Sequence, residues 1–278
     1  MQSFSSIAKR FGVSVTSIIR WFDNLNYPHP KLPECIAIDE LRGNAGGEKF
    51  QCNIADPVKH RVIDILPSRN TENLCKHFLE YPYKERAAVK KIIMDLSTLF
   101  RSVAKSMFPE AKIVADKFHV IRAVINSLEN VRKRIQKEFH ATKRKWFKRS
   151  RYLLLKPEYK LTSEDKTELA RMLNSSYDLE KAYVLKERFY EVFRKQTRTE
   201  AKKELGKWLL LAADLSLPEF RHCITTFSNW KTEIANIIGE RVSNGFIEGS
   251  NNKIKVLKRI SYGVQNFDRF RNRILYLQ

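Results

Sequence analysis

Hydrophobic residues are spaced differently in three regions of this 278-residue chain. Residues 4–23 carry apolar positions at helical spacing on both sides of a glycine. Residues 35–115 alternate short apolar runs with helical patterns, and from residue 121 to residue 239 only helical spacing remains. The pattern predicts two short helices, then a sheet with interspersed helices, and then an all-helical block.

The first pair of predicted helices has the spacing of a helix-turn-helix. In FSSIAKRFGVSVTSIIRWFD (residues 4–23), Ala8 permits close helix contact, Gly12 suits a left-handed turn and Ile18 packs back between the helices. An ordinary helical hairpin is the alternative. Because a helix-turn-helix normally follows a supporting helix, we expect the chain to be truncated at its N-terminus.

The second of these helices is the one that would face DNA. Ser14 is its expected N-cap, and Ser17 and Arg20 are expected to point outward. We assign residues 1–24 to this partial DNA-binding unit. Residues 25–33 hold three prolines and no periodicity, so they are predicted to be a linker.

Short apolar runs predict five strands and two helices in the order β-β-β-α-β-α-β. Gly43, Gly46 and Gly47 lie in the predicted turn between the first two strands. The predicted strands are Cys35–Ile38, Lys49–Ala55, Arg61–Leu66, Lys91–Met94 and Ala111–Ala115, and the helices are Thr71–Tyr81, capped by Thr71, and Leu96–Phe108. This order predicts an α/β (α+β) fold with a mixed sheet.

Two acids directly follow predicted strands that can be neighbours. Asp39 follows the first strand and Asp95 follows the fourth. Two carboxylates side by side repel each other, and a divalent cation stabilises them together. Oxygen ligands favour Mg²⁺ or Mn²⁺ over zinc. A third carboxylate from a later helix, Glu248, would complete a two-metal site.

Glu248 is the one acid in NGFIEGSNNKIKVLKR (residues 244–259), a basic helix suited to a polyanion. A carboxylate facing phosphate is repelled unless a metal lies between them. Asn244, Asn252 and Lys255 share its helix face, so Lys255 would reach neighbouring phosphates. Gly249 would let a DNA backbone approach closely.

Strand-end acids also occur as ordinary loop residues or helix caps, and this alternative applies to each of the three. Asp116 also follows a strand and competes with Asp95 for the second role. Asp56 and Asp64 fit worse, because one precedes a proline and the other lies within an alternating strand.

The charge balance points to a polyanionic partner. Fifty-two basic and 31 acidic residues give a net charge of +21, which favours nucleic acid over ribosomal protein or an anionic membrane. No apolar run is long enough to span a bilayer, and the N-terminus lacks the apolar region of a signal peptide. The four cysteines show no CxxC spacing and suit a reduced protein without a zinc site or disulfides.

Basic residues concentrate in two segments. Residues 131–151 contain Arg144 and Lys145 among their basic residues, with Trp146, Phe147 and Tyr152 interleaved. These aromatics either stack on exposed bases or, as we favour, pack the helix against its neighbour. The second segment lies on the Glu248 helix and is better placed to bind DNA beside the acids; it comprises Asn252, Lys253, Lys255, Lys258 and Arg259.

Five sequence blocks resemble insertion-sequence transposases of the ISL3 family, which are DDE-type enzymes. The blocks are IAIDE (36–40), MDLS (94–97), IVADKFHVIRAV (113–124), SNGFIEGSNNKIKVLKRISYG (243–263) and NFDRFRNRILY (266–276). The resemblance implies a ribonuclease H-like fold with a helical insertion before the last acid. It makes Asp39, Asp95 and Glu248 a triad that binds two Mg²⁺ or Mn²⁺ ions. Asp116 and His119 fall in the family's D-x-F-H-V segment and would support the site or contact DNA.

The resemblance also implies the domain organisation and the reaction. Residues 34–120 and 240–278 would form the catalytic core, and 121–239 the helical insertion. The expected function is DNA cleavage at transposon ends and strand transfer to target DNA, by a homodimer or larger assembly on double-stranded DNA. A bacterial cytoplasmic, nucleoid-associated location would follow.

Two other functions remain open from the sequence. Full-length members carry a cysteine-rich zinc-binding segment before the helix-turn-helix, and this chain has none. A non-catalytic DNA-binding regulator derived from a transposase would have the same charge, although it would not need three acids. A structure-specific nuclease on the same fold would lack strand transfer.

Overall fold

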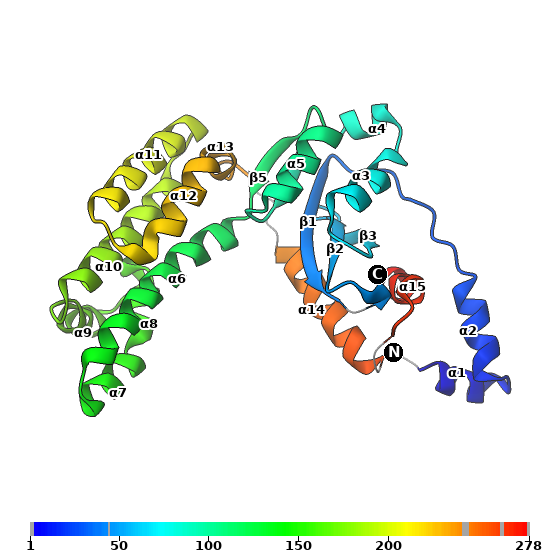
Figure 1. Cartoon of the computed structure of the whole chain (residues 1–278), viewed down its shortest axis with the longest axis horizontal. Coiled ribbons are helices and arrows are strands. Elements are labelled where there is room, and N and C mark those ends of the chain that lie inside the picture. Colours follow the sequence, from blue (N-terminus) through cyan, green and yellow to red (C-terminus); the bar gives the residue numbers. More distant parts are fainter. Residues whose placement is uncertain (1–2, 44, 241–244, 262–263, 277–278) are drawn as a thin grey trace. The chain divides into compact units, whose positions relative to one another are not determined.

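Two compact units make up the computed structural model, which describes residues 3–43, 45–240, 245–261 and 264–276. The first unit comprises Met1–Ile113 and Val242–Gln278, and the second comprises Val114–Arg241. Figure 1 shows strands and helices in the first unit, and mainly helices in the second. The predicted α/β class is confirmed.

A five-stranded mixed sheet has the order β3-β2-β1-β4-β5 (Figure 1). Strand β1 runs antiparallel to β2 and parallel to β4. The strands are β1 (Cys35–Arg42), β2 (Phe50–Asp56), β3 (Arg61–Leu66), β4 (Lys91–Met94) and β5 (Lys112–Ala115). The predicted neighbourhood of the first and fourth strands is therefore confirmed.

Strand β1 is longer than predicted. Its parallel pairing with β4 stops at Ile38 and Met94, but its antiparallel pairing with β2 continues to Arg42 and Phe50. Asp39 therefore lies within β1, at the point where β4 ends, and not beyond the strand as predicted. The polar residues that suggested a strand end are tolerated because β2 still pairs with this part of the backbone.

The glycine-rich turn and the helices around the sheet largely match the predicted pattern. Gly46 and Gly47 have φ angles of 74° and 80° in a short 3₁₀ turn, η1 (Ala45–Gly47), a backbone region that favours glycine. Asn70, not the predicted Thr71, caps α3, because its side chain accepts from the Asn73 amide. The helices here are α3 (Thr71–Leu79), α4 (Tyr83–Ala87), which was not predicted, and α5 (Thr98–Met107).

Helices α1 (Phe4–Phe11) and α2 (Val15–Asp23) are the predicted pair of short helices on either side of Gly12 and form a hairpin. Gly12 has φ 63°, and the Ser14 hydroxyl caps α2 by accepting from the Ser17 amide at 3.0 Å. Ala8 and Ile18 are buried between the helices. Arg20 is exposed, and Ser17 is half-buried with its hydroxyl 2.9 Å from that of Ser14.

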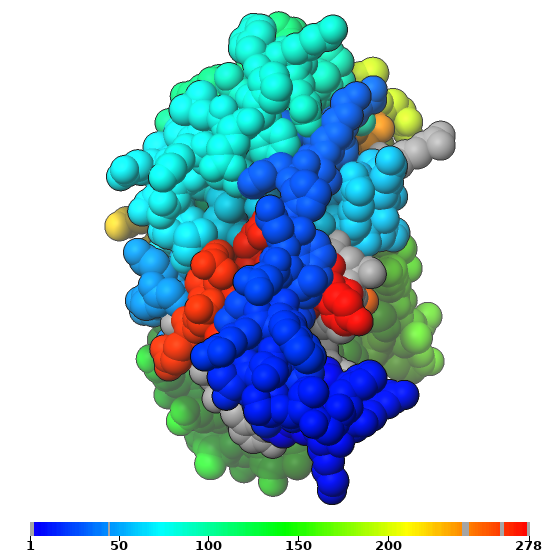
Figure 2. Space-filling view, turned by 90° about the vertical axis from the view of Figure 1, so that its right-hand side faces the viewer, coloured from blue at the N-terminus to red at the C-terminus, as the bar shows by residue number. Residues whose placement is uncertain are grey.

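The N-terminal hairpin is fastened to α15 (Phe267–Tyr276) near the C-terminus. Arg269 donates to both carboxylate oxygens of Asp23, at 2.8 and 2.6 Å, and the Asn272 amide donates to the Leu25 carbonyl. Figure 2 shows the N-terminal segment in blue, with the red C-terminal residues beside it. The predicted linker thus runs along the surface of the first unit.

Helix α14 (Gly245–Ile260) crosses β1 and β2. Its residues Ile254 and Leu257 join a buried cluster with Leu41 of β1 and with Phe270 and Ile274 of α15. This apolar contact holds α14 against the sheet and thereby fixes the side chains one and two turns earlier on the helix.

The second unit is built around aromatic side chains. Phe189 lies 4.9 Å from Trp208 and 5.3 Å from Phe227 between ring centroids, and all three are buried. Its helices are α6 (Lys117–Ile135), α7 (Ala141–Arg149), α8 (Arg151–Leu155), α9 (Ser163–Leu173), α10 (Tyr177–Tyr190), α11 (Arg198–Asp214), α12 (Arg221–Asn229) and α13 (Lys231–Ala235). Short 3₁₀ turns join them: η2 (Gln136–Glu138), η3 (Glu158–Lys160), η4 (Glu191–Arg194) and η5 (Pro218–Phe220). Among all helices described in both units, none has the length and apolar character needed to cross a bilayer.

Candidate functional site

Asp39 and Asp95 occupy neighbouring positions at the sheet centre. The last paired residues of β1 and β4 are Ile38 and Met94, and each acid is the next residue in its chain. Adjacent strands lie about 4.7–4.9 Å apart, so the two carboxylates start from neighbouring backbones. Asp39 is buried, and the Asp95 carboxylate accepts from the Ser97 amide at 3.1 Å.

An asparagine on α14 connects this helix to Asp39. The Asn251 side-chain amide donates to Oδ2 of Asp39 at 2.8 Å, and its oxygen accepts from the amide of Asn53 at 2.7 Å. Asn53 lies opposite Asp39 in the β1–β2 pairing, so both side chains emerge on the face that α14 covers. Asn251 is 5% exposed. This buried chain of hydrogen bonds fixes one oxygen of Asp39 and sets the rotation of α14 above it.

Glu248 lies one turn before Asn251 on α14 and is half-buried. In the described part of the chain, oxygens of Asp39, Asp95 and Glu248 do not all lie within 4.8 Å of one another. A pair of ions about 3.5–4 Å apart would bridge a wider set of oxygens than one ion. Asn244, predicted to share this helix face, lies outside the described residues.

The chemistry around these acids suits a hard divalent cation. Cys52 of β2 is buried nearby, and burial raises the pKa of its thiol well above the usual value. The negative charges of Asp39 and Asp95 raise that pKa further, so the thiol stays protonated and is a poor metal ligand. The remaining donors are carboxylate oxygens, which Mg²⁺ and Mn²⁺ prefer.

Asp116 and His119 form a local pair at the start of α6. Asp116 caps this helix through the Phe118 amide at 3.0 Å, and its other oxygen lies 2.7 Å from Nδ1 of His119. In the sheet order, β5 is separated from β1 by β4. The acid at the end of β4, Asp95, is therefore closer in the sheet to Asp39 than the acid at the end of β5.

Comparison with known proteins identifies the family. Residues 36–274 match the model of a transposase family, that of the ISL3 insertion sequences. The chain belongs to the ISL3 transposase family. The match begins within β1 and ends within α15, so it includes the central strands and α14.

Individual relatives agree with this family. The ISL3-family chain is 25% identical over 241 residues to the transposase for insertion sequence element IS1001 of Bordetella parapertussis, covering 85% of this chain and 59% of that protein. It is 24% identical over 254 residues to the transposase for IS1557 of Mycobacterium tuberculosis, covering 83% and 57%. The chain thus spans less than two thirds of the length of these relatives. A 94-residue stretch is 35% identical to a Lactococcus lactis protein named as an ATP-dependent protease, covering 34% of this chain and 26% of that protein.

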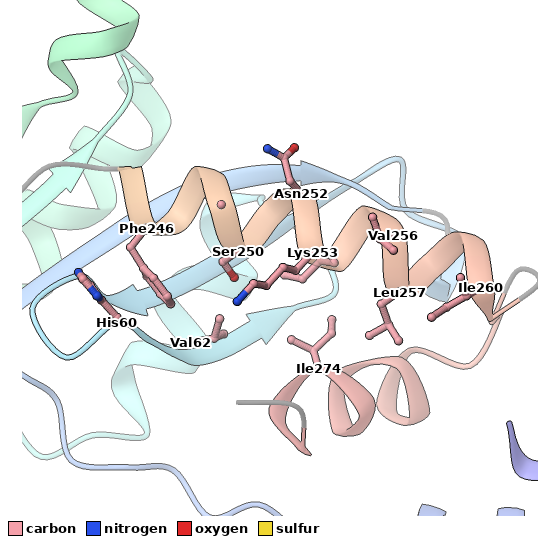
Figure 3. A pocket seen from close by; sticks show the side chains of 12 residues that line it. His60, Val62, Phe246, Ser250, Asn252, Lys253, Val256, Leu257, Ile260 and Ile274 are labelled. Carbon is pink, nitrogen blue, oxygen red and sulfur yellow. The ribbon is translucent and has the colours of Figure 1, made fainter. Parts of the chain in front are cut away.

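The flank of α14 that faces β3 and α15 in this ISL3-family chain borders an open groove of about 640 Å³. Val62 of β3 and Ile274 of α15 form part of its wall, and Lys253 runs along it (Figure 3). Lys255 and Arg259 are exposed on the same helix. The predicted DNA-contacting side chains of α14 are thus distributed around the helix.

The basic segment 131–151 is only partly free for DNA. Arg132 is buried and paired with Glu129 at 2.9 Å, and Arg134 is paired with Asp178 and Glu219. The Arg132 pair lies within α6, whereas Arg134 connects α6 to α10 and η5, so neither guanidinium group belongs to the basic surface expected to bind DNA. Arg144 and Lys145 of α7 are exposed.

The interleaved aromatics pack mainly within the helical unit. Phe147 is fully buried, and the ring N–H of Trp146 donates to Glu168. Tyr152 is 55% exposed, and its hydroxyl donates to Asp165 at 3.4 Å. The favoured packing interpretation is confirmed for Phe147 and Trp146.

Sequence reasoning missed Asn251, whose partners are distant in the chain. One signal was present: with Ile247 and Ile254 it forms an i, i+4, i+7 series on the apolar face of α14. A polar residue in such a series needs a buried partner, and here Asp39 and Asn53 supply it.

Proposed function

We propose that this chain is the catalytic part of a DDE transposase, which cuts DNA at the ends of an insertion sequence and joins the freed 3′-hydroxyls to target DNA. The observation that carries the proposal is the placement of Asp39 and Asp95 on neighbouring parallel strands, with α14 fastened above Asp39 through Asn251. Family membership supports the same reaction class.

In this proposal Asp39, Asp95 and Glu248 hold two Mg²⁺ or Mn²⁺ ions. Bound divalent ions supply activation of a water or 3′-hydroxyl and stabilisation of the leaving oxygen in an in-line phosphodiester displacement. The protein sets the position of the carboxylates: Asn251 orients Asp39, and the Ser97 amide orients Asp95. Asp116 and His119 act as a supporting pair.

DNA contacts in this proposal come from three sets of basic and polar residues, most of which are exposed. Arg20 of α2 reads the transposon end, while Arg144 and Lys145 of α7 bind phosphates without reading sequence. Around α14 the phosphate-binding residues are Asn252, Lys253, Lys255, Lys258 and Arg259. Cutting two ends together calls for a homodimer or larger assembly on double-stranded DNA.

Replacement of single acids tests the reaction directly. Asp39→Asn and Glu248→Gln keep side-chain size, so we expect DNA affinity to be retained. Even outer-shell partners of metal ligands contribute about 10–100-fold, so cleavage by either variant should fall by more than about 100-fold. Gel-shift assays measure DNA affinity, and Mg²⁺-dependent strand-cleavage assays measure the reaction, both on DNA that carries the element's own ends. The exposed Glu48→Gln in the same unit is the control, and normal cleavage by Asp39→Asn would remove that acid from the mechanism.

The same assays separate the alternative functions. A DNA-binding regulator would give no Mg²⁺- or Mn²⁺-dependent nicking from the wild-type chain. A nuclease would cut DNA without joining a 3′-end to target. Joined products that depend on Asp39 and Glu248 would support the transposase.

A further inference from the structure

Three potential metal ligands meet on the first unit, away from the central acids. His29 comes from the proline-rich segment before β1, His77 from α3, and Glu80 directly follows α3 as its C-cap. Each offers one ligand atom, and these atoms lie within 4.8 Å of one another. The cluster thus brings together two parts of the chain that are far apart in sequence: the segment that precedes β1, and helix α3.

Both imidazole rings present the same nitrogen to one carboxylate. Oδ2 of Asp64 lies 3.9 Å from Nδ1 of His29 and 3.8 Å from Nδ1 of His77. Metal-binding histidines usually turn their second nitrogen toward a carboxylate, and Asp64 lies beside both Nδ1 atoms, although beyond hydrogen-bond distance. Asp64 is held in place by Arg271, which donates to both of its oxygens.

The Nε2 atoms of the two rings have different surroundings. Nε2 of His29 lies 3.0 Å from Oε2 of Glu80. His77 is only 6% exposed, and among the described residues its buried Nε2 has no hydrogen-bond partner. A buried ring nitrogen in this condition costs free energy unless a ligand satisfies it.

We propose that His29, His77 and Glu80 form a zinc site that ties the segment before β1 to α3. Two imidazoles and one carboxylate are a donor set that zinc accepts, whereas Mg²⁺ prefers oxygen ligands alone. In a tetrahedral site with Zn–N near 2.0–2.1 Å, ligand atoms are roughly 3.3 Å apart, close to the His29–Glu80 separation of 3.0 Å.

The charges nearby do not oppose the ion. Arg271 is neutralised by Asp64, and Glu80 supplies a negative charge. The hydroxyl group of Tyr81 lies 3.5 Å from Nδ1 of His29 and is uncharged in its ordinary protonated form. The side chains of His29 and Glu80 are 40% and 48% exposed, which gives an ion an entry path. Figure 2 shows the N-terminal segment on the surface of this unit.

Metal analysis of the untagged full chain tests the site. Protein saturated with Zn²⁺ in excess Mg²⁺ and then desalted should retain about one zinc ion per chain by mass spectrometry. Co²⁺ in its place should give the visible absorption of a tetrahedral site. His29→Ala, at an exposed position, and Glu80→Gln should lose both signals, and zinc should raise Tm in the wild type but not in these variants.

His60→Ala is the matched control, because His60 is an exposed histidine of the same unit that stacks on Phe246. It should bind zinc as the wild type does. The proposal is overturned if the wild type retains no zinc, or if His29→Ala and Glu80→Gln retain it fully. His77→Gln adds a test at the buried ligand, and circular dichroism shows whether that variant folds. These readouts do not depend on DNA cleavage, so they stand apart from the transposase proposal.

Discussion

At the scale of single residues, Asn251 is the side chain that joins the helix of Glu248 to the strand of Asp39. Its side-chain amide donates a hydrogen bond to Asp39 and accepts one from Asn53, and all three residues are buried. A buried hydrogen bond to a charged group is stronger than one between neutral groups, and loss of one partner leaves the other unsatisfied. Asn251 therefore contributes both to stability and to the position of Asp39.

Asn251→Ala should lower the free energy of unfolding by about 1–3 kcal/mol, because Asp39 and Asn53 lose their shared partner. Strand cleavage should fall by about 10–100-fold, as for outer-shell partners of metal ligands, with little change in DNA affinity. Denaturant titration and cleavage assays measure the two effects. Asn252→Ala, exposed on the same helix, should change stability by less than about 0.5 kcal/mol. Equal effects of the two substitutions would show that the buried amide has no special role.

The sequence predicted single residues well where a short-range rule applied. Gly12 and Ser14 act at the N-terminal hairpin as their local backbone requires. Asn251 and His77 were not predicted, because their partners are set by tertiary packing. At α3 two adjacent residues could cap the helix, and only the structure distinguishes Asn70 from Thr71.

At the scale of elements, Gly249 is unusual within α14. A glycine inside a helix costs about 0.5–1 kcal/mol relative to alanine. A Cβ at this position would contact no described residue within 4 Å, so packing within the described part of the chain does not require glycine here. Close approach of a DNA backbone beside Glu248 would require it.

Gly249→Ala should therefore raise the free energy of unfolding by about 0.5–1 kcal/mol and weaken DNA binding. Gly12→Ala should instead lower it by about 1–2 kcal/mol, since Gly12 has a left-handed backbone with φ 63°. Thermal unfolding and gel shifts compare the two variants. Unchanged DNA affinity in Gly249→Ala would argue against close approach at this position.

Strands and helices were predictable where apolar runs had clear ends. The spans of β3 and β4 match the prediction. The extension of β1 to Arg42 was not predicted, because pairing with β2 depends on a partner strand and not on the apolar pattern. The proline segment was predicted as a linker from composition, and its contacts with α3 and α15 appear only in the fold.

At the scale of the whole molecule, the net charge of +21 overstates the basic surface available to DNA. Arg132, Arg134 and Arg271 are engaged by carboxylates within their own units. Composition counts these groups as free, and only tertiary structure separates them from exposed cations such as Arg144 and Lys145.

Salt dependence of DNA binding distinguishes the two kinds of basic residue. Each phosphate contact adds about 0.9 to the slope of log affinity against log salt. Arg144→Ala and Lys145→Ala should each reduce this slope by about 1 and weaken binding to all sequences alike. Arg134→Ala should leave the slope unchanged, because its guanidinium group is bound to Asp178 and Glu219. A smaller slope in Arg134→Ala would contradict this division.

The central claim is that Asp39, Asp95 and Glu248 together bind divalent ions when the protein is bound to DNA. Electron paramagnetic resonance titration of Mn²⁺ tests it most directly, using the DNA complex in a His29→Ala background that removes the proposed zinc site. The account predicts about two Mn²⁺ ions per chain, lost in Asp39→Asn and Asp95→Asn and retained in Asp116→Asn, where asparagine still caps α6. Unchanged Mn²⁺ binding in Asp39→Asn, or its loss only in Asp116→Asn, would contradict it.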